Sequence, residues 1–562
     1  MPKWRPWALL GCFIGFAGVL VWRAVDLQVL KRDFLLSQGD ARFLRDMEIP
    51  AHRGIIRDRN GEPLAISTPV DSVWANPSDL LSAGRDKIAL LARLLRLNTD
   101  RLLADLQARR SREFIYLRRG ITPNLGQRVI DLRLPGVALQ REYRRFYPAG
   151  EVAGQVIGFT NIDDVGQEGL ELAFNSWLQG QPGEKRVIKD RLGRVIEDVE
   201  RLREPKPGHE LTLSLDRRLQ YIAYRALKAA VQERHARSGS LVLLDAHTGE
   251  VLAMVSQPAF NPNDRSELIP SHYRNRAVTD AFEPGSSIKP FTIAAALDSG
   301  RFSPHTVIDT TPGVLRVAGD TVHDVHDYGV IDVATVIEKS SNVGAAKIAL
   351  DLAPGTVWRL LSSVGFGHPT GSGFPGEAAG YLSGRPPRYL IDRATLAFGY
   401  GFSVTALQLA HAYTAIANDG RLLPVSLLRV NSAPAGRRVM SAHAARAVRR
   451  MMELVVSSEG TAPQAAIPGY RVAGKTGTVE KSVAGGYSDH HHVALFTGIA
   501  PASDPRFICT VIINEPTGSY YGGLVAAPVF ARVTEAALRL RNVPPDGGSE
   551  RPALLAAGGV RP

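Results

Sequence analysis

Five strand-like segments divide between the two ends of residues 209–545, and this division constrains the fold more than any other feature of the sequence. Two come early, at 240–245 and 250–255, and three come late, at 469–479, 493–499 and 507–514. Between them, residues from about 284 to 460 carry apolar residues mostly at helical spacing. One antiparallel sheet can join both ends only if the helical block is inserted within it. We therefore predict an α+β domain over 209–545 with a five-stranded antiparallel sheet.

An apolar run near the N-terminus has the length of a short membrane span. It covers residues 7–25 if Arg23 extends its charged end to the interface. A cleaved signal peptide is the alternative, but no small-x-small cleavage site follows the run. Basic residues precede the run and no second span follows it, so the positive-inside rule places the rest of the chain outside the cytoplasm. We predict a cytoplasmic N-terminus at 1–5 and a retained anchor at 6–25.

Length and composition narrow the remaining possibilities. A chain of 562 residues exceeds what one hydrophobic core organises, so at least two domains are expected. The net charge of +12 does not indicate nucleic-acid binding, because the arginines are interspersed with acidic residues and no basic helix occurs. The two cysteines, Cys12 and Cys509, lie far apart and have no metal-ligand neighbours. We expect neither a disulfide framework nor a metal or other cofactor.

A change of composition near 204–208, where Pro and Gly cluster, separates two parts of the chain. The part from 26 to 208 is rich in arginine, glycine and turns, has a more helical insert at about 88–107, and shows no reactive constellation. We predict a separate domain over 26–208. The tail at 546–562 is rich in Gly, Pro and Ala and is expected to be disordered.

A hydroxyl and an amine lie three residues apart where a turn leads into a predicted helix. Pro284 and Gly285 form the turn, Ser286 follows, and Lys289 lies one helical turn further on the same face. A serine hydroxyl becomes a good nucleophile only when a base takes its proton, and a lysine can do so only if its pKa falls from about 10.4 towards neutrality. For an isolated Ser-x-x-Lys pattern, a serine helix cap followed by a surface lysine is the commoner interpretation.

Two further triplets favour the catalytic interpretation. One is Ser340-Ser341-Asn342, between two predicted helices, and the other is Lys475-Thr476-Gly477, followed by Thr478 on a predicted strand. Ser-x-x-Lys, Ser-x-Asn and Lys-Thr-Gly each occur once, in that order, within one predicted domain. An ordered set of three such motifs is a strong signal for acyl transfer.

The first two motifs supply groups for proton transfer. Ser286 would attack a carbonyl while Lys289 takes its proton. Ser340 would pass a proton towards the leaving amine, and Asn342 would hold both the substrate amide and Lys289.

The third motif supplies groups for substrate binding. The cation of Lys475 would anchor a carboxylate and depress the pKa of Lys289. Gly477, which follows Thr476, would let a substrate strand approach the sheet edge closely. The backbone N–H groups of Ser286 and Thr478 would form an oxyanion hole, which is worth roughly 3–4 kcal/mol per donor.

With these motifs the chain resembles the class B penicillin-binding proteins, close to the FtsI type of division-associated peptidoglycan transpeptidase from Gram-negative bacteria. The resemblance covers nearly the whole chain, including segments 53–65, 144–150 and 189–196. It implies the penicillin-binding transpeptidase fold, related to serine β-lactamases, with helices on both faces of the sheet and a helical subdomain. It also implies that residues 26–208 form a periplasmic pedestal of the dimerisation type.

The resemblance also implies an activity, a location and partners. The substrate would be a peptidoglycan stem peptide ending in D-Ala-D-Ala, which acylates Ser286 and is passed to the amine of a neighbouring stem, with possible carboxypeptidase activity. β-Lactams would trap the same serine. The chain would sit in the inner membrane with its catalytic domain in the periplasm, beside an FtsW-type polymerase and other division proteins. Tyr520 and Tyr521 would wall the active site.

Two stretches depart from the family pattern. After Thr478 the division enzymes continue with a small residue and then a basic one, whereas this chain has Val479 and Glu480. Residues 487–492, Tyr-Ser-Asp-His-His-His, are expected to form a loop; its histidines would titrate near neutrality, and a metal site there is disfavoured because adjacent loop side chains diverge. The aromatic run at 398–402 is assigned to packing.

Three alternatives remain open at this stage. One is an accessory division-type transpeptidase, suggested by Glu480 and the histidines. The second is a serine β-lactamase or D,D-carboxypeptidase, which has the same three motifs but uses water as acceptor; no recognisable glutamate motif for activating that water is present. The third is a β-lactam sensor, for which no second span or output domain is evident.

Overall fold

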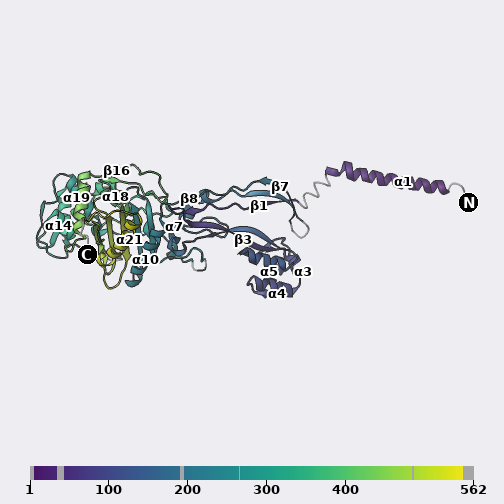
Figure 1. Ribbon diagram of the computed structural model, residues 1–562, viewed down its shortest axis with the longest axis horizontal. Coiled ribbons are helices and arrows are strands. Elements are labelled where there is room, and N and C mark those ends of the chain that lie inside the picture. The colour runs from purple at the N-terminus through teal and green to yellow at the C-terminus, as the bar shows by residue number, and fades with distance from the viewer. Residues whose placement is uncertain are drawn as a thin grey trace, which may run out of the picture. The chain divides into compact units, whose positions relative to one another are not determined.

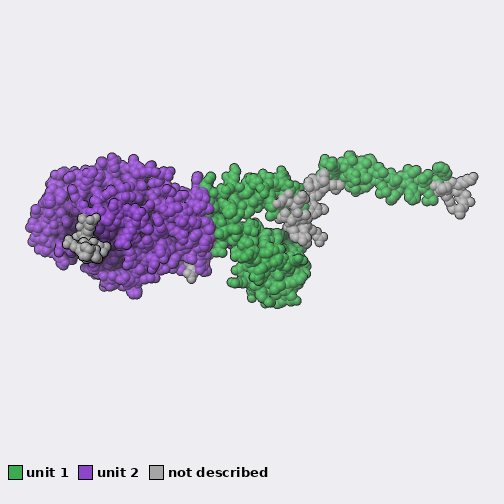
Figure 2. Space-filling model, in the orientation of Figure 1, with its two compact units in different colours: residues 1–54, 67–145, 179–209 green, residues 55–66, 146–178, 210–562 purple. Residues whose placement is uncertain are grey.

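The computed structural model describes residues 5–33, 44–189, 195–264, 266, 268–483 and 486–547 (Figure 1). Its contacts divide the chain into two compact units, which alternate along the sequence (Figure 2). The first unit comprises 1–54, 67–145 and 179–209, and the second comprises 55–66, 146–178 and 210–562. The chain therefore passes between the units several times, and the last passage, at 209/210, lies one residue after the predicted boundary at 208/209. The predicted disordered tail lies outside the described residues from 548 onward.

The N-terminal apolar run is helical. It forms α1 (Arg5–Val25), which continues as a short π-helix, η1 (Asp26–Leu30). Residues Trp7–Leu30 are the one stretch among the described residues that is long and apolar enough to cross a membrane. The apolar helix thus extends five residues beyond the predicted end of the anchor.

The first unit has two sheet portions and a small helical core. Its strands are β1 (Leu44–Ile49), β6 (Gly183–Lys189) and β7 (Val195–Arg203) in one sheet, and the later part of β3 (Pro63–Ala75) with β4 (Ile115–Ile121) and β5 (Val137–Phe146) in the other. Its helices are α3 (Pro77–Ser82), α4 (Arg85–Leu94), α5 (Thr99–Ala108) and α6 (Pro123–Asp131). Leu80, Leu91 and Leu106 are fully buried in the core that these helices enclose. The helical insert predicted at about 88–107 is present as α4 and α5.

The second unit is built on the predicted five-stranded antiparallel sheet. Its strands, in spatial order, are β10 (Val251–Gln257), β9 (Ser238–Asp245), β19 (Phe507–Asn514), β18 (Gly486–Ala500) and β17 (Ala473–Val483). Helices α10 (Arg217–Glu233) and α21 (Ala527–Leu540) pack on one face, and α18 (Ala406–Ala417) packs on β9 and β19 from the other. The α+β prediction is confirmed.

The inserted block between β10 and β17 is mainly helical, as predicted. Its principal helices are α12 (Arg276–Thr279), α13 (Lys289–Asp298), α14 (Val333–Glu338), α15 (Asn342–Asp351), α16 (Thr356–Ser363), α17 (Leu390–Leu396), α18 and α19 (Ala442–Leu454). It also contains three two-stranded ribbons: β11 (Val307–Asp309) with β14 (Val330–Asp332), β12 (Val314–Val317) with β13 (Asp320–His323), and β15 (Arg421–Leu422) with β16 (Arg437–Arg438).

One local expectation is wrong. Residues 487–492 were expected to form a loop, but they belong to β18, which pairs with β17 in a hairpin. Glu480 lies opposite His492, and the register shifts immediately after Glu480. Tertiary pairing with a long partner strand overrides the polar composition of this stretch.

Shorter elements connect these parts. They are β2 (Ile56–Arg57), β8 (Leu211–Thr212), η2 (Gly150–Val152), α7 (Gly154–Ile157), α8 (Gly169–Ala173), α9 (Asn175–Leu178), α11 (Pro270–Tyr273), η4 (Gly285–Ile288), η5 (Pro463–Ala465) and α20 (Gly522–Val525).

Candidate active site

The turn that carries Ser286 is fixed by close backbone packing. Gly285 has a φ of 51°, and its N–H donates to the Gly399 carbonyl at 3.1 Å. A Cβ added at Gly285 would lie 2.5 Å from Val479 Cγ2 on β17, so only glycine fits here without displacement. Ser286 lies in the 3₁₀ turn η4, and Lys289 is the first residue of α13. The sequence prediction of a turn followed by a helix is confirmed.

Lys289 lies at the centre of the polar cluster. Its Nζ donates to Ser286 Oγ at 2.9 Å, to Asn342 Oδ1 at 2.7 Å and to Ser340 Oγ at 3.2 Å. It also donates to the Ser340 carbonyl. The side chain is fully buried. The structure therefore brings together all four residues that the first two motifs predicted, although they come from segments more than 50 residues apart.

Lys475 approaches the same cluster from the sheet. Its Nζ lies 2.9 Å from Ser340 Oγ, so this hydroxyl lies between the two lysine amines. Lys475 is fully buried, and burial lowers its pKa to about 7. The pKa of Lys289 is lowered well below 10.5, first by burial and then by the Lys475 charge, while Asp324 opposes the shift. An uncharged amine next to a hydroxyl is the arrangement that a general base requires.

Asp324, which the sequence motifs did not identify, orients the second motif. Its carboxylate accepts from Ser341 Oγ at 2.6 Å, from Val343 N at 3.0 Å and from Asn342 N. These groups lie at the start of α15, where N–H groups have no intrahelical partner. Ser340, just before them, has a φ of 62°, a left-handed conformation that costs about 1–2 kcal/mol for a residue with a Cβ. Asp324 therefore helps to hold Ser340 and Asn342 towards Lys289.

The third motif lies on the edge strand β17. Thr476 Oγ1 is 3.1 Å from Thr461 Oγ1, and Thr478 Oγ1 accepts from Gly522 N at 3.2 Å. A Cβ at Gly477 would lie 2.7 Å from two atoms of the Leu495 side chain. The glycine is thus needed for packing within the sheet, in addition to any role in substrate approach.

The two tyrosines predicted to wall the site lie beside β18. Tyr520 stacks on His492 with ring centroids 4.0 Å apart, and Tyr521 lies 4.7 Å from Tyr520. Within the part of the chain that the structure describes, neither tyrosine forms a hydrogen bond with Ser286 or Lys289. The tyrosines are therefore packed against the strand hairpin through His492.

His491 and His492 on β18 contact different partners. His491 Nδ1 lies 3.5 Å from Glu515, whereas His492 stacks on Tyr520. No group of three or more His, Cys, Asp or Glu side chains placed to hold a metal ion occurs among the described residues.

The aromatic run at 398–402 does more than pack. Glu283, just before the turn that carries Ser286, accepts from Gly401 N at 2.8 Å and from Tyr487 OH at 3.2 Å. Tyr400 lies 5.5 Å from Tyr487, and burial followed by the Glu480 charge raises the pKa of Tyr400 to about 12. This run therefore supports the turn directly, through Gly399 and Gly401.

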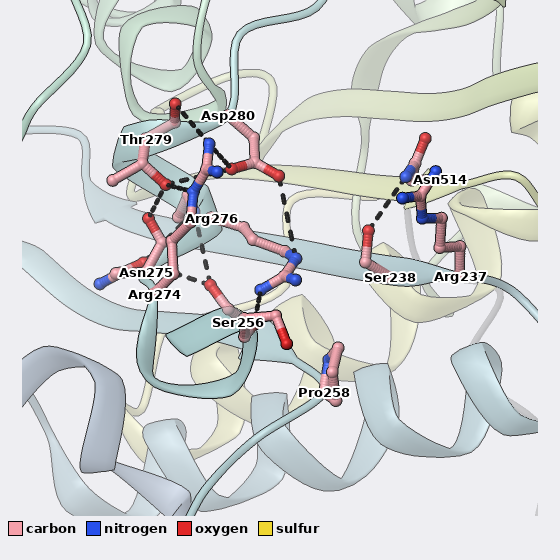
Figure 3. A network of polar contacts seen from close by, with 12 residues as sticks. Arg237, Ser238, Ser256, Pro258, Arg274, Asn275, Arg276, Thr279, Asp280 and Asn514 are labelled. Atoms are coloured by element: carbon pink, nitrogen blue, oxygen red, sulfur yellow. Dashed lines mark hydrogen bonds and ion pairs between the residues drawn. The ribbon is translucent and has the colours of Figure 1, made fainter. Parts of the chain in front are cut away.

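A second network fixes the segment leading into the turn (Figure 3). Asn275 caps α12 by accepting from Ala277 N at 3.2 Å, and Ser256 of β10 donates to Asn275 at 3.2 Å. Arg274 pairs with Asp280 at 2.6 Å. These residues carry no motif, so the sequence alone gave no reason to single them out.

Comparisons with known proteins agree with this geometry. Residues 239–535 match the penicillin binding protein transpeptidase domain, and residues 48–213 match the penicillin-binding protein dimerisation domain. The chain is 44% identical to a probable peptidoglycan D,D-transpeptidase PbpC of Pseudomonas aeruginosa, over 95% of this chain and 94% of the relative. It is 42% identical to the peptidoglycan D,D-transpeptidase FtsI of Escherichia coli K12, over 97% of this chain and 93% of the relative.

A solved structure extends the comparison to the fold. Penicillin binding protein 3 of Mycobacterium tuberculosis, complexed with aztreonam, superposes with a TM-score of 0.69 at 29% identity, covering 89% of this chain and 98% of the other. Both the catalytic fold and the preceding domain are therefore shared over nearly the full length. This chain belongs to the class B penicillin-binding proteins.

Proposed function

We propose that this chain is a serine-type peptidoglycan D,D-transpeptidase that crosslinks stem peptides during septal wall synthesis and is acylated by β-lactams. The observation that carries the proposal is the Lys289 amine, fully buried and 2.9 Å from Ser286 Oγ, with Lys475 on the other side of Ser340. Relatives named peptidoglycan D,D-transpeptidases match nearly the whole chain. The assignment of a stem peptide ending in D-Ala-D-Ala as the substrate rests on membership of this family.

Acylation begins with proton transfer. Neutral Lys289 takes the proton of Ser286 Oγ as that oxygen attacks the carbonyl carbon of the penultimate D-Ala. The backbone N–H groups of Ser286 and Thr478 stabilise the resulting oxyanion. When the C–N bond breaks, the proton held by Lys289 passes through Ser340 to the leaving D-Ala amine.

Deacylation reverses these proton transfers. The amine of a neighbouring stem attacks the acyl-Ser286 carbonyl, and its proton returns to Ser286 Oγ through the same pair of lysine and serine. Water in place of the amine gives the carboxypeptidase product. Asn342 holds both the substrate amide and the Lys289 amine during these steps.

Lys475 and the edge of β17 bind the substrate. The charged form of Lys475 attracts the terminal carboxylate, and the hydroxyls of Thr476 and Thr478 lie beside it on the strand. The free edge of β17 in the sheet order, next to Gly477, accepts the substrate as an added strand. We assign Tyr520 and Tyr521 to the outer wall of this groove, beyond the lysine cluster.

We infer an inner-membrane protein with a periplasmic catalytic domain. Residues 6–25, in the apolar helix, would be the anchor, residues 26–208 the pedestal and 209–545 the catalytic domain, followed by a disordered tail. The partners would be an FtsW-type polymerase and other division proteins of the membrane, with no role for nucleic acid.

A second candidate is an accessory transpeptidase of the same type. Glu480 favours it, because the resemblance implies a basic residue at this position. Both candidates use the same chemistry, so they differ in substrate or β-lactam preference and in when the enzyme is needed. Depletion that produces filamentous cells supports the main division enzyme.

The test uses the full-length protein in detergent and a fluorescent penicillin. We expect wild type to form a lasting adduct, Ser286→Ala to form none, and the control Ser299→Ala, at the end of α13, to label normally. Crosslinking of lipid II polymer made by an added polymerase then distinguishes an enzyme from a sensor. Labelling that survives in Ser286→Ala, or rapid release of hydrolysed penicillin, would contradict the proposal.

A further inference from the structure

A recess rich in arginine lies in the catalytic unit among residues that play no part in the lysine cluster. It has a volume of about 610 Å³ and lies between the end of α18, the start of α19 and the turns that follow β9 and β18. The ionisable side chains that line it are Arg421, Arg438, Arg446, Arg449, Asp419, Asp504 and His247. With His247 neutral, four arginines and two aspartates leave an excess of positive charge.

Two of the arginines share one carboxylate, that of Asp419. Arg446 donates through Nε and Nη2 to Asp419 Oδ2 at 2.9 and 2.6 Å, and Arg449 Nη1 lies 3.3 Å from the other oxygen of Asp419. Burial alone would raise the pKa of Asp419, but the Arg446 hydrogen bond and the Arg449 charge lower it overall. Because both oxygens of Asp419 contact arginines of α19, this carboxylate cannot also neutralise Arg421 and Arg438.

Those other two, Arg421 and Arg438, face each other across a strand pair. They are directly opposite in the β15–β16 ribbon, which places their side chains on one face. Each donates through Nη1 to backbone carbonyls, Arg421 to Gly436 and Arg438 to Asp419 and Met440. Within the described ranges, neither has a carboxylate within ion-pair distance. Like charges directly opposite each other destabilise a strand pair, and the hydrogen bonds to backbone carbonyls leave both charges unneutralised.

The backbone holds these two arginines in place. Gly420, next to Arg421, has a φ of 88°, and a Cβ there would lie 2.1 Å from the Met440 carbonyl oxygen. The Gly420 carbonyl in turn accepts from Val439 N at 2.9 Å. The backbone beside Arg421 is thus closely packed, which restricts the ribbon that carries the two guanidinium groups and lowers the entropy cost of binding a ligand between them.

We propose that this recess binds a small multivalent anion, with phosphate or carboxylate groups, between Arg421 and Arg438. A guanidinium group suits such oxygens because it can donate two parallel hydrogen bonds. The volume accommodates a ligand larger than a single phosphate. Binding would relieve the like-charge pair and hold β15 and β16 together. The proposal does not depend on the chemistry assigned to Ser286.

The test measures binding of inorganic pyrophosphate and of tricarballylate to the full-length protein in neutral detergent. Isothermal titration calorimetry gives the affinity, and thermal unfolding gives the stabilisation, each against sodium chloride of equal ionic strength. The test variant is Arg421→Gln with Arg438→Gln. The matched control is Arg437→Gln with Arg450→Gln, which removes the same charge from two exposed arginines outside the recess.

We expect saturable binding and a higher unfolding temperature with at least one of the two anions. The test variant should bind at least about tenfold more weakly, the effect of losing charge-assisted hydrogen bonds, while the control binds like wild type. A preference for pyrophosphate would identify a phosphate ligand, and a preference for tricarballylate a carboxylate ligand.

A second measurement keeps the proposal testable if the test variant fails to fold. At low salt without anion, the single change Arg421→Gln should leave the unfolding temperature equal or higher, because it removes one of two facing like charges. The proposal is overturned if neither anion binds wild type beyond the sodium chloride control, or if the test variant binds as tightly as the matched control.

Discussion

Asp324→Ala tests how far the positioning of Ser340 and Asn342 depends on one carboxylate. The substitution removes the acceptor of the Ser341 hydroxyl, at 2.6 Å, and of two N–H groups at the start of α15. Hydrogen bonds to a charged acceptor are worth about 1.5–3 kcal/mol each, but water replaces part of this at a half-buried site. We therefore expect the free energy of unfolding to fall by about 2–4 kcal/mol.

The same change should reduce the acylation rate by a larger factor than it reduces the folded fraction of the protein. A displacement of about 1 Å in a catalytic group costs up to about 100-fold in rate, so we expect acylation by fluorescent penicillin to slow by about 10–100-fold. Because Asp324 raises the pKa of Lys289, its removal should shift the pH profile of the remaining activity to lower pH.

The control is Asp320→Ala, which removes an exposed carboxylate from β13, beside Asp324. Stopped-flow labelling and circular dichroism of the full-length proteins give the rate and the folded fraction. Wild-type acylation in Asp324→Ala, or an equal loss in Asp320→Ala, would refute the positioning role of Asp324.

Three further changes test other parts of the account. Lys475→Met should abolish acylation yet raise the free energy of unfolding at pH 7 by about 2–4 kcal/mol. The gain is expected because the buried lysine, with its pKa near 7, binds fewer protons at pH 7 than the same lysine in the unfolded chain. This gain should shrink as pH rises from 7 to 10.5. Gly477→Ala should lower the unfolding free energy by about 1–3 kcal/mol, because its Cβ meets Leu495, and denaturant titration checks this. Glu480→Arg should change the rate of acylation by anionic β-lactams. A rate equal to that of wild type would show that this charge does not affect the site.

The fold could largely be predicted because its signals are local. Strands such as 507–514 and helices such as α10 carry their own periodicity, and the insertion of the helical block follows from their order in the chain. The interleaving of the two compact units could not be predicted, because it depends on which distant segments pack together. The strand at 487–492 was missed for the same reason, since pairing with β17 decides its conformation.

The candidate site could be predicted where a motif carries the chemistry. Ser286, Lys289 and Lys475 were identified because each residue type has a task at a recognisable spacing. Asp324 and Gly399 could not be identified in this way. They act through contacts with backbone groups far away in the sequence, and no spacing rule predicts such contacts.

The central claim is that Ser286 is activated by an uncharged Lys289, kept neutral by burial and by Lys475. The pH dependence of the acylation rate of the full-length wild type by a fluorescent penicillin tests this claim most directly. The account predicts a rate that rises with an apparent pKa well below 10.5 and is already substantial at neutral pH. A rate that is negligible at neutral pH and still rises through pH 10, as for an ordinary lysine, would contradict it.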